Sequence, residues 1–360
     1  MQNMPSVRDV EVSGKRVLVR VDFNVPITDG VVVDDARIRA ALPTIQLLLE
    51  RGAAEIMLLT HIGRPKGVDQ SLSVLPVEKR LRELGVPVSV VLHENLRFDP
   101  REEANDPAFA QELATLGDVY INDAFSNAHR EHASMVGVPK LLPHAAGLHM
   151  LDEIAHLEQA LTPPKGSLAI IGGAKFETKL PLFQRLLQGY EALLLGGALA
   201  NDLYKARGFP FGASVVSDQP VPMDLALDER IFLPGDITVV ELGQHTERML
   251  LPNDIRANER AVDIGPKTIE EWSAKIAAAP FVLWNGPVGV YEEGYNTGTL
   301  ALAQALAKSA ARAVVGGGDT VAALQTQEFS SERIFVSMGG GAMLQFLADG
   351  TLPAIEALKQ

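Results

Sequence analysis

Cysteine is absent from the sequence. The chain therefore forms no disulfide framework, no thiolate nucleophile and no cysteine-ligated metal site. Long apolar runs are absent as well, since none approaches the roughly 18 residues that suggest a membrane span. The first residues, MQNMPSVRDV, lack the basic-then-apolar pattern of a signal peptide. We therefore expect a cytoplasmic protein without a membrane partner.

Positive charge is also scarce. The chain has 32 lysine and arginine residues against 45 aspartate and glutamate residues, which gives a net charge of −13. Nonspecific nucleic-acid binding needs a basic surface, so we expect no nucleic-acid partner. Small anionic ligands remain possible because they need only local positive charge.

The length of 360 residues is too great for one ordinary hydrophobic core and predicts two domains. The amphipathic segment 148–161 precedes Thr162, Pro163 and Pro164. Prolines stop a helix, so this segment predicts a helix at the connection between the domains.

In the first half of the chain, short apolar segments alternate with segments of helical spacing, which predicts a parallel, doubly wound sheet. The predicted strands are 16–21, 55–60, 87–91 and 118–122, and the predicted helices include 36–49 and 75–83.

Polar and basic side chains follow these predicted strands. Ligands bind at the carboxyl ends of strands in open α/β sheets, and the arginine fork suits phosphate and carboxylate groups. We therefore interpret these side chains as one basic pocket rather than as scattered solvated charges. They are Asp22 and Asn24 after the first strand, Arg37 at the start of the first helix, His61 and Arg64 after the second strand, Arg97 after the third, and His129, Arg130 and His132 after the fourth.

A metal site at His129 and His132 is disfavoured. No third ligand with metal-site spacing accompanies them, and Arg130 between them would repel a cation.

In the second half, predicted strands end in glycine. Glycine clusters ahead of helices expose backbone N–H groups and the positive end of the helix dipole to a bound anion. For one cluster alone, a tight turn would be the simpler explanation. The predicted strands 168–171, 192–195, 281–284, 313–315 and 334–336 lead into Gly172-Gly173, Gly196-Gly197, Asn285-Gly286, Gly316–Gly318 and Gly339–Gly341.

Charged residues accompany these glycines. Lys175 and Lys179 are four residues apart, so a helix would place both on one face, where they favour a polyanion unless both are simply solvated. Asp319 follows the fourth glycine cluster and is suited to hold Mg²⁺. Neither G-x-x-x-x-G-K-[ST] nor G-x-G-x-x-G is present. The residues alone predict a two-domain α/β protein that transfers a phosphoryl group between a small anion and a nucleotide.

Eight segments stand out in the sequence: RVLVRVDFNVP, LLTHIGRPKG, ENLRF, DVYINDAF with AHREHAS, IIGGAKFETKL, LWNGPVGVYE, VVGGGDTVAAL and SMGGGA. They occur in the order found in the phosphoglycerate kinase family, which the chain resembles from about Gly14 to its end. The resemblance implies an α/β fold of two doubly wound parallel-sheet domains joined by a hinge helix. It implies a 3-phosphoglycerate-binding domain over 1–150, an interdomain helix and hinge over 151–166, a nucleotide-binding domain over 167–345 and a tail over 346–360 that returns to the first domain.

The implied activity is reversible phosphoryl transfer between 1,3-bisphosphoglycerate and ADP, which gives 3-phosphoglycerate and ATP. Mg²⁺ is the implied cofactor, and the implied mechanism is direct in-line transfer after closure about the hinge. The resemblance also implies a monomer whose partners are these small-molecule substrates.

Site residues are implied at the matching positions of the family's motifs. The implied catalytic residues are Arg37, Lys175 and Gly340, and the implied metal ligand is Asp319. The implied substrate-binding residues are Asp22, Phe23, Asn24, Arg37, His61, Ile62, Gly63, Arg64, Arg97 and Arg130. The implied nucleotide-binding residues are Lys175, Lys179, Gly196, Gly197, Asn285, Glu292, Gly317, Gly318, Asp319 and Thr320.

The chain departs from the family pattern at Ser126-Asn127, Glu177 and Met338, none of which removes an implied charged residue. Three rival functions remain. A dinucleotide-dependent dehydrogenase is disfavoured by the missing G-x-G-x-x-G and by the two lysines. A non-catalytic binding protein is disfavoured because the implied charged residues are intact. A different small-molecule kinase requires that the basic pocket admit another acid.

Overall fold

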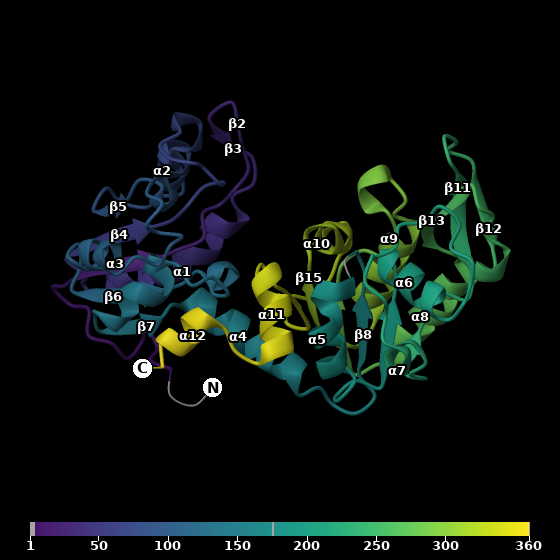
Figure 1. Ribbon diagram of the computed structural model, residues 1–360. Coiled ribbons are helices and arrows are strands. Elements are labelled where there is room, and N and C mark those ends of the chain that lie inside the picture. Colours follow the sequence, from purple (N-terminus) through teal and green to yellow (C-terminus); the bar gives the residue numbers. More distant parts are fainter. Residues whose placement is uncertain (1–3, 175, 360) are drawn as a thin grey trace. The chain divides into compact units, whose positions relative to one another are not determined.

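The computed structural model describes residues 4–174 and 176–359 (Figure 1). The chain divides into two compact units. Unit 1 comprises Met1–Ala155 and Thr351–Gln360, and unit 2 comprises His156–Gly350. Across the described part of the chain, no helix combines the length and the apolar character that crossing a bilayer requires.

Unit 1 is built on a five-stranded parallel sheet in the order β5-β4-β1-β6-β7. Its strands are β1 (Arg16–Arg20), β4 (Glu55–Leu59), β5 (Val90–Leu92), β6 (Val119–Asn122) and β7 (His144–Ala146). Its helices are α1 (Ala36–Glu50), α2 (Leu75–Glu83), α3 (Pro107–Ala114) and α12 (Pro353–Ala357), and β2 (Ile27–Thr28) pairs with β3 (Val31–Val32) in a hairpin. Single turns of helix occur at Gln70–Leu72, Leu96–Phe98, Phe125–Asn127, Ala133–Gly137 and Val138–Lys140.

The alternation of side chains along β1 decides what each face of this sheet carries. Val17 and Val19 belong to a buried cluster that includes Ile38 and Ile45 of α1. Arg20 lies one residue beyond Val19, so its side chain leaves the sheet on the opposite face, yet only 1% of it is exposed. A buried guanidinium must find partners, which makes this end of β1 a polar site.

Unit 2 contains a six-stranded parallel sheet in the order β10-β9-β8-β14-β15-β16. Its strands are β8 (Leu168–Ile171), β9 (Ala192–Leu195), β10 (Ile231–Phe232), β14 (Phe281–Asn285), β15 (Arg312–Gly316) and β16 (Ile334–Val336). A second, antiparallel sheet has the order β12-β11-β13, with β11 (Ile237–Glu241), β12 (Glu247–Leu250) and β13 (Glu259–Ile264). Its single turns are Pro252–Asp254 and Tyr291–Glu293.

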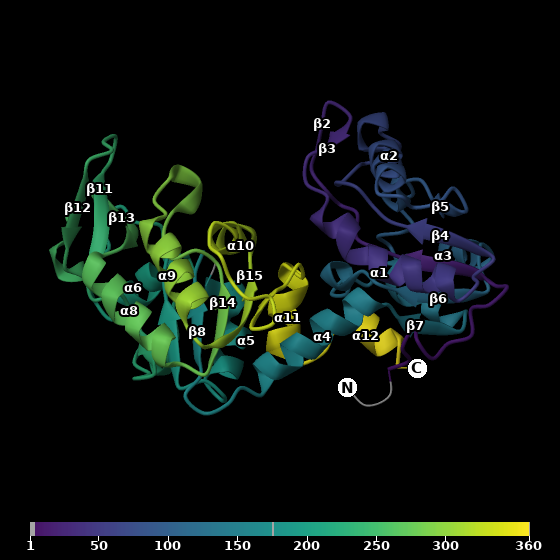
Figure 2. The same cartoon turned by 180° about the vertical axis from the view of Figure 1, so that it is seen from behind.

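Helices cover both faces of the six-stranded sheet. Figure 2 shows α8 and α9 in front of it, and residues of both helices share a buried cluster with β8, β14 and β15. The helices of unit 2 are α5 (Phe176–Leu186), α6 (Ala198–Ala206), α7 (Met223–Ala226), α8 (Pro266–Ala278), α9 (Thr297–Lys308), α10 (Gly318–Gln325) and α11 (Gly341–Asp349).

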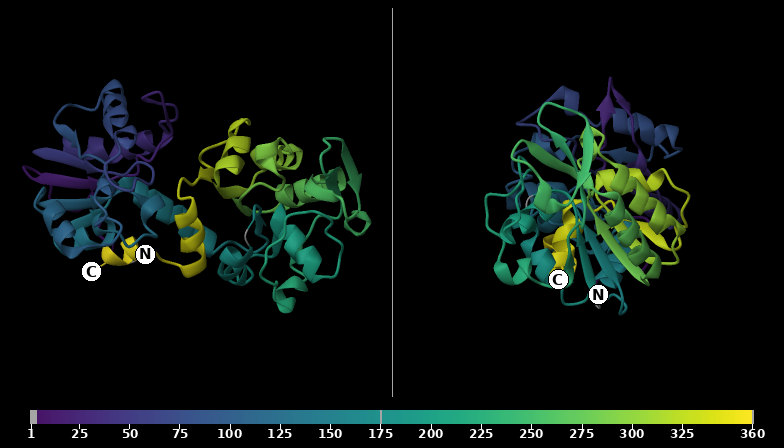
Figure 3. Two further views of the ribbon diagram at one scale, coloured as in Figure 1. Left: turned by 45° about the horizontal axis from the view of Figure 1, so that its top comes forward. Right: turned by 90° about the vertical axis from the view of Figure 1, so that its right-hand side faces the viewer.

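One helix connects the two units, and the C-terminal helix returns to unit 1. Helix α4 (Leu148–Leu161) runs from unit 1 into unit 2. The C-terminal helix α12 packs in unit 1 (Figure 3), where Ala354 N donates a hydrogen bond to Ala128 O at 3.0 Å.

Each parallel sheet reverses its strand order once. In unit 1 the order runs outward from β1 to β4 and β5 on one side and to β6 and β7 on the other. In unit 2 the corresponding reversal lies between β8 and β14. Ligands of doubly wound folds bind at the carboxyl ends of the strands at such a reversal. The fold thus places one ligand-binding edge in each unit.

The predicted fold class is confirmed, and so are the predicted strands Leu168–Ile171, Ala192–Leu195 and Ile334–Val336. The prediction of a strand over 87–91 is wrong at its start, because β5 begins at Val90. Residues 87–90 form a turn in which Val90 N donates to Pro87 O at 3.0 Å. The antiparallel sheet of unit 2 was not predicted.

Candidate substrate and nucleotide sites

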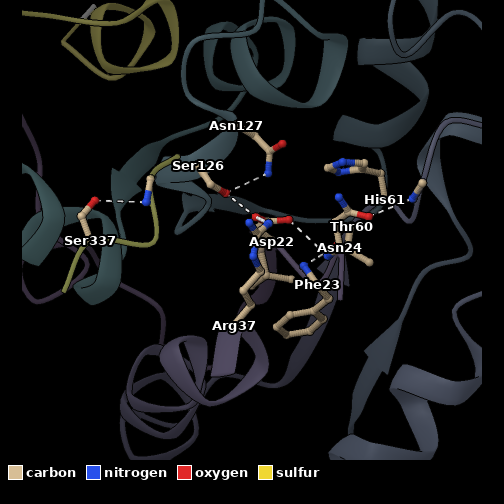
Figure 4. A network of polar contacts seen from close by, with 12 residues as sticks. Asp22, Phe23, Asn24, Arg37, Thr60, His61, Ser126, Asn127 and Ser337 are labelled. Carbon is tan, nitrogen blue, oxygen red and sulfur yellow. Dashed lines mark hydrogen bonds and ion pairs between the residues drawn. The ribbon is translucent and has the colours of Figure 1, made fainter. Parts of the chain in front are cut away.

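Asp22 is the centre of the polar contacts at the carboxyl end of β1 (Figure 4). Its Oδ2 accepts hydrogen bonds from Nη1 of Arg37 and from Oγ of Ser126. Its Oδ1 accepts from Asn24 N at 3.1 Å. Arg37 stands in the first turn of α1, so this carboxylate ties the strand end to the start of the helix.

Asn24 links this strand end to the loop after β4. Its Oδ1 accepts a hydrogen bond from Gly63 N at 2.9 Å, and Phe23 N donates to Oγ1 of Thr60 at 2.9 Å. Gly63 has a φ of +62°, a conformation that favours glycine. Two backbone N–H groups, one side-chain amide and one hydroxyl therefore hold the loops after β1 and β4 together.

A basic cluster, which we define as Arg20, His61, Arg97, Arg130 and His132, lies in the same unit. Arg20, His61 and Arg97 are buried. Arg97 donates from Nη1 to Gly63 O at 2.7 Å and pairs through Nε with Glu103 at 2.9 Å. Among the residues that the structure describes, Arg97 Nη2 and Arg130 Nε have no hydrogen-bond partner. Buried donors without partners are costly, so an anion that accepts from them would be strongly favoured.

The cluster's electrostatics favour neutral imidazoles beside charged guanidinium groups. Burial, reinforced by Arg20, Arg97, Arg130 and His132, lowers the pKa of His61 well below its usual value. Burial and the same three arginines lower the pKa of His132 to about 3. Both histidines are therefore neutral at pH 7, and the positive charge of the cluster resides on its arginines.

The predicted substrate residues separate into two groups. The first group is Asp22, Asn24 and Arg37, which are joined by hydrogen bonds to Asp22. The second group is His61, Arg97 and Arg130, whose charges interact within the basic cluster. Arg64 is exposed, and its charge also helps to lower the pKa of Arg97. Gly63 joins the two groups through its N–H and its carbonyl. Phe23 and Ile62, by contrast, have side chains in the hydrophobic core. Only the backbone groups of these two residues could touch a ligand.

Sequence reasoning missed Arg20 and Ser126. Arg20 ends an apolar strand, and strand alternation would have placed it on a buried face with Leu18. Ser126 was noted only as a departure, although its hydroxyl contacts Asp22.

Glycine is required by close packing at the β8–β14 edge of unit 2. A Cβ on Gly172 would lie 1.9 Å from Pro287 O, and one on Gly316 would lie 2.3 Å from Sδ of Met343. Gly197 and Gly317, the residues preceding α6 and α10, have φ values of +62° and +93°. These loops therefore bring backbone N–H groups close together at two helix starts, as phosphate binding requires.

A cavity of about 320 Å³ opens beside these loops. This volume falls within the range of about 300–1,000 Å³ that is common for small-molecule pockets. Much of its lining is apolar or backbone, which suits the flat face of a nucleobase. Among the predicted residues it is lined by Gly197, Glu292 and Asp319, and further lining residues that were not predicted include Asn201, Tyr204, Arg260, Val262, Asp263 and Val288.

The other predicted nucleotide residues lie around this cavity or in the adjacent strand ends. Gly196 and Asn285 are both buried. Gly196 packs against Val288, and Nδ2 of Asn285 lies 3.7 Å from Sδ of Met343. Gly318 and Thr320 belong to the first turn of α10.

Lys179 and the start of α11 share a second, open groove of about 390 Å³. Lys179 donates from Nζ to Gly172 O at 2.6 Å, and burial lowers its pKa to about 8. Gly340 precedes α11 with a φ of +53°, and Gly341 lines the groove with Lys179. An ammonium and a helix N-terminus together suit an anionic group. Lys175, the other predicted lysine, lies outside the described residues.

Asp319 is the predicted metal ligand. Its pKa is raised, first by burial and then by the neighbouring carboxylate of Glu292. Two carboxylates that repel one another fit a cation between or beside them, and Mg²⁺ commonly uses one or two carboxylates together with substrate phosphates. No cluster of three or more histidine, aspartate or glutamate residues with metal-binding geometry occurs in the described ranges. The residues present therefore fit a metal carried in with a nucleotide.

Comparisons with known proteins find relatives over nearly the whole chain. The sequence model of the family described as phosphoglycerate kinase matches residues 7–91 and 85–350. The chain is 43% identical to the phosphoglycerate kinase of Chloroflexus aurantiacus and 44% identical to that of Thermomicrobium roseum, with at least 99% of each chain covered. It is also similar to the solved structure of phosphoglycerate kinase from Coxiella burnetii, with 35% identity and a TM-score of 0.87 over 99% of this chain and 98% of that one.

Proposed function

The chain belongs to the phosphoglycerate kinase family, and from this membership we propose which of its residues perform the reaction. The reaction is the reversible transfer of a phosphoryl group between 1,3-bisphosphoglycerate and ADP, which gives 3-phosphoglycerate and ATP. The chain is thus a kinase with ATP and ADP as substrates.

We propose that unit 1 binds the glycerate. The observation that carries this assignment is the basic cluster, in which the buried atoms Arg97 Nη2 and Arg130 Nε have no acceptor among the described residues. A phosphate supplies several acceptor oxygens and negative charge at once. Arg64, exposed beside the cluster, adds a further positive charge. Asp22 and Asn24 would bind the hydroxyl and carboxylate end of the glycerate, Asp22 as an acceptor and Asn24 through its amide.

We propose that unit 2 binds the nucleotide. The cavity beside Gly197 and Val288 would hold the nucleoside. The backbone groups of Gly317, Gly318 and Thr320 at the start of α10 would hold phosphates, with Lys179 pairing with their charge. Asp319 would hold Mg²⁺, which neutralises phosphate charge when bound. Asn285 and Glu292 would contact the ribose and phosphate side.

Transfer requires alignment and charge neutralisation rather than a general base. In the ATP-consuming direction the attacking group is the carboxylate of 3-phosphoglycerate, which is already ionised at pH 7. We propose that Arg37 and Lys175 stabilise the charge on the moving phosphoryl group and that the helix start at Gly340 receives it.

The two ligands must meet for direct transfer, so we propose that the protein closes about the connection at 148–166 when both are bound. Small-angle X-ray scattering should report a smaller radius of gyration with both substrates than with either alone. An unchanged radius would contradict closure. We also propose that the protein acts as a monomer in the cytoplasm and binds neither nucleic acid nor membranes.

The reaction is tested by incubating the purified protein with ATP, Mg²⁺ and 3-phosphoglycerate and coupling the bisphosphoglycerate formed to NADH oxidation. Turnover should require all three components. Turnover without 3-phosphoglycerate would indicate another acceptor, and nucleotide binding without turnover would indicate a non-catalytic binding protein.

A further inference from the structure

A chain of buried polar groups leads from Glu102 to His61 inside unit 1. Glu102 is fully buried and accepts two hydrogen bonds from Ser134, from N to Oε2 at 2.9 Å and from Oγ to Oε1 at 2.5 Å. Ser134 Oγ in turn accepts from Nε of Arg20 at 2.9 Å. Nη2 of Arg20 lies 3.2 Å from Nδ1 of His61. The chain therefore joins a buried carboxylate to an imidazole through one hydroxyl and one guanidinium.

Only one assignment of donors and acceptors satisfies the hydrogen bonds that link Glu102, Ser134, Arg20 and His61. A guanidinium has no acceptor, so Arg20 donates to both of its partners. Ser134 has one hydroxyl proton, and because its oxygen accepts from Arg20, that proton is free to go to Glu102. Nδ1 of His61 must accept from Arg20 and cannot carry a proton. The ring proton of a neutral His61 is therefore on Nε2.

The surroundings of His61 also oppose a second ring proton. The charged and titratable groups that act on it are Arg20, Arg97, Arg130 and His132. Three of these are guanidinium groups, and burial followed by their repulsion lowers the pKa of His61. A neutral Nε2–H can donate to a bound anion without adding charge to a cluster that is already strongly positive.

We propose that Glu102 and Ser134 are positioning residues that orient Arg20, and that Arg20 holds His61 as the neutral Nε2–H tautomer, which donates to the bound glycerate. This inference rests on the proposed function for the glycerate itself, but the tautomer is a property of the free protein. Glu102 also supplies the buried negative charge that Arg20 needs, since Arg20 has no direct carboxylate partner among the described residues.

The tautomer is tested in the full chain by nitrogen NMR with ¹⁵N-labelled histidine. The chain has 8 histidines, and the His61 signals are assigned by their loss in His61→Gln. Between pH 6 and 8 we expect the shift of an unprotonated nitrogen at Nδ1 and of a protonated one at Nε2. A protonated Nδ1, or an imidazolium, would overturn the inference.

The role of the hydrogen-bonded groups from Glu102 to His61 is tested by Ser134→Ala. This variant removes the Ser134 hydroxyl and keeps the hydrogen bond from its backbone N–H to Glu102. We expect the KM for 3-phosphoglycerate to rise about tenfold, the loss typical of a hydrogen bond to a charged group. The KM for ATP should stay unchanged, and His61 should populate both tautomers. Tyr120→Phe is the matched control: Tyr120 is equally buried and donates to Ser134 O at 2.6 Å, outside the path to Arg20. Equal effects of the two variants would reduce the role of Ser134 to packing and overturn the proposal.

The outcomes separate this inference from the function on which it rests. A wild-type protein without turnover on 3-phosphoglycerate would overturn the proposed function. A protonated Nδ1 in a fully active enzyme would overturn only the role given to Glu102, Ser134 and Arg20. If Ser134→Ala does not fold, the wild-type NMR measurement still decides the tautomer.

Discussion

Arg37 and Asp22 form a hydrogen-bonded ion pair between the first turn of α1 and the loop after β1. The Asp22 carboxylate is buried, whereas the Arg37 side chain is 37% exposed. Asp22 therefore anchors one side of the guanidinium, and its other donors have no partner among the described residues and can turn toward a ligand. This pair connects the residues proposed to bind the glycerate with the residue proposed to act on the transferring group.

Arg37→Lys should impair catalysis although it keeps the charge. An ammonium cannot pair with Asp22 and a phosphoryl oxygen in the fixed geometry of a guanidinium fork. We expect kcat to fall about 10²-fold, by analogy with the removal of one positioned donor. Steady-state kinetics in the coupled assay measure the change, with Arg39→Lys on the exposed side of the same helix as control. Equal activity of the Arg37→Lys and wild-type proteins would refute the role of the fork.

Lys175→Ala tests a residue that lies outside the described residues, so this prediction rests on the sequence. If Lys175 stabilises the transferring group, its removal should cost roughly 3–4 kcal/mol of transition-state stabilisation. The value follows from kcat/KM measured beside the control Lys308→Ala, which removes an exposed lysine at the end of α9. A kcat close to that of the wild type would contradict the assignment.

Lys179 should make nucleotide binding depend on pH. Burial lowers its pKa to about 8, so an increasing fraction is neutral as the pH rises through 8. A bound polyphosphate favours the charged form and raises this pKa, so binding should take up protons near pH 8 and weaken above it. Calorimetric titration with ADP in buffers of different ionisation enthalpy measures the uptake. The variant Lys179→Arg stays charged and should lose this pH dependence; if it keeps it, another group titrates.

Gly172→Ala should destabilise unit 2. The added Cβ would lie 1.9 Å from Pro287 O, so the loops after β8 and β14 would have to separate. Overpacking of this kind typically costs about 1–3 kcal/mol of unfolding free energy. Gly235→Ala is the control, since a Cβ there meets nothing within 4 Å. Denaturant unfolding compares the two, and equal midpoints would show that the loops are free to move apart.

The fold was largely predictable because its main signals are local. Apolar strands end in glycine or in charged residues, and both patterns are visible without knowing which strands pair. The antiparallel sheet β12-β11-β13 was not predicted because its strands lack a clean alternation. Four of the five residues of β11 are buried, whereas β12 is mostly exposed.

Parts of the candidate sites could not be predicted because they depend on distant contacts. Arg20 and Ser134 are 114 positions apart, and only the folding of unit 1 brings them together. The wall of the nucleoside cavity includes Tyr204 and Val262, whose side chains look like ordinary core residues in the sequence. The charged residues proposed for the sites, apart from Arg20, could be named from the sequence because several of them follow predicted parallel strands, where ligands of such folds bind.

In the proposed function, each unit binds one substrate by its own residues. Calorimetric titration of the intact wild-type, Arg97→Ala and Asp319→Asn proteins, with 3-phosphoglycerate and MgADP in separate experiments, tests it most directly. Arg97→Ala should weaken 3-phosphoglycerate binding at least tenfold and leave MgADP unchanged, because Arg97 supplies buried donors to the anion. Asp319→Asn should do the reverse. Weaker binding of both ligands in either variant would contradict this assignment. So would weaker MgADP binding in Arg97→Ala or weaker 3-phosphoglycerate binding in Asp319→Asn.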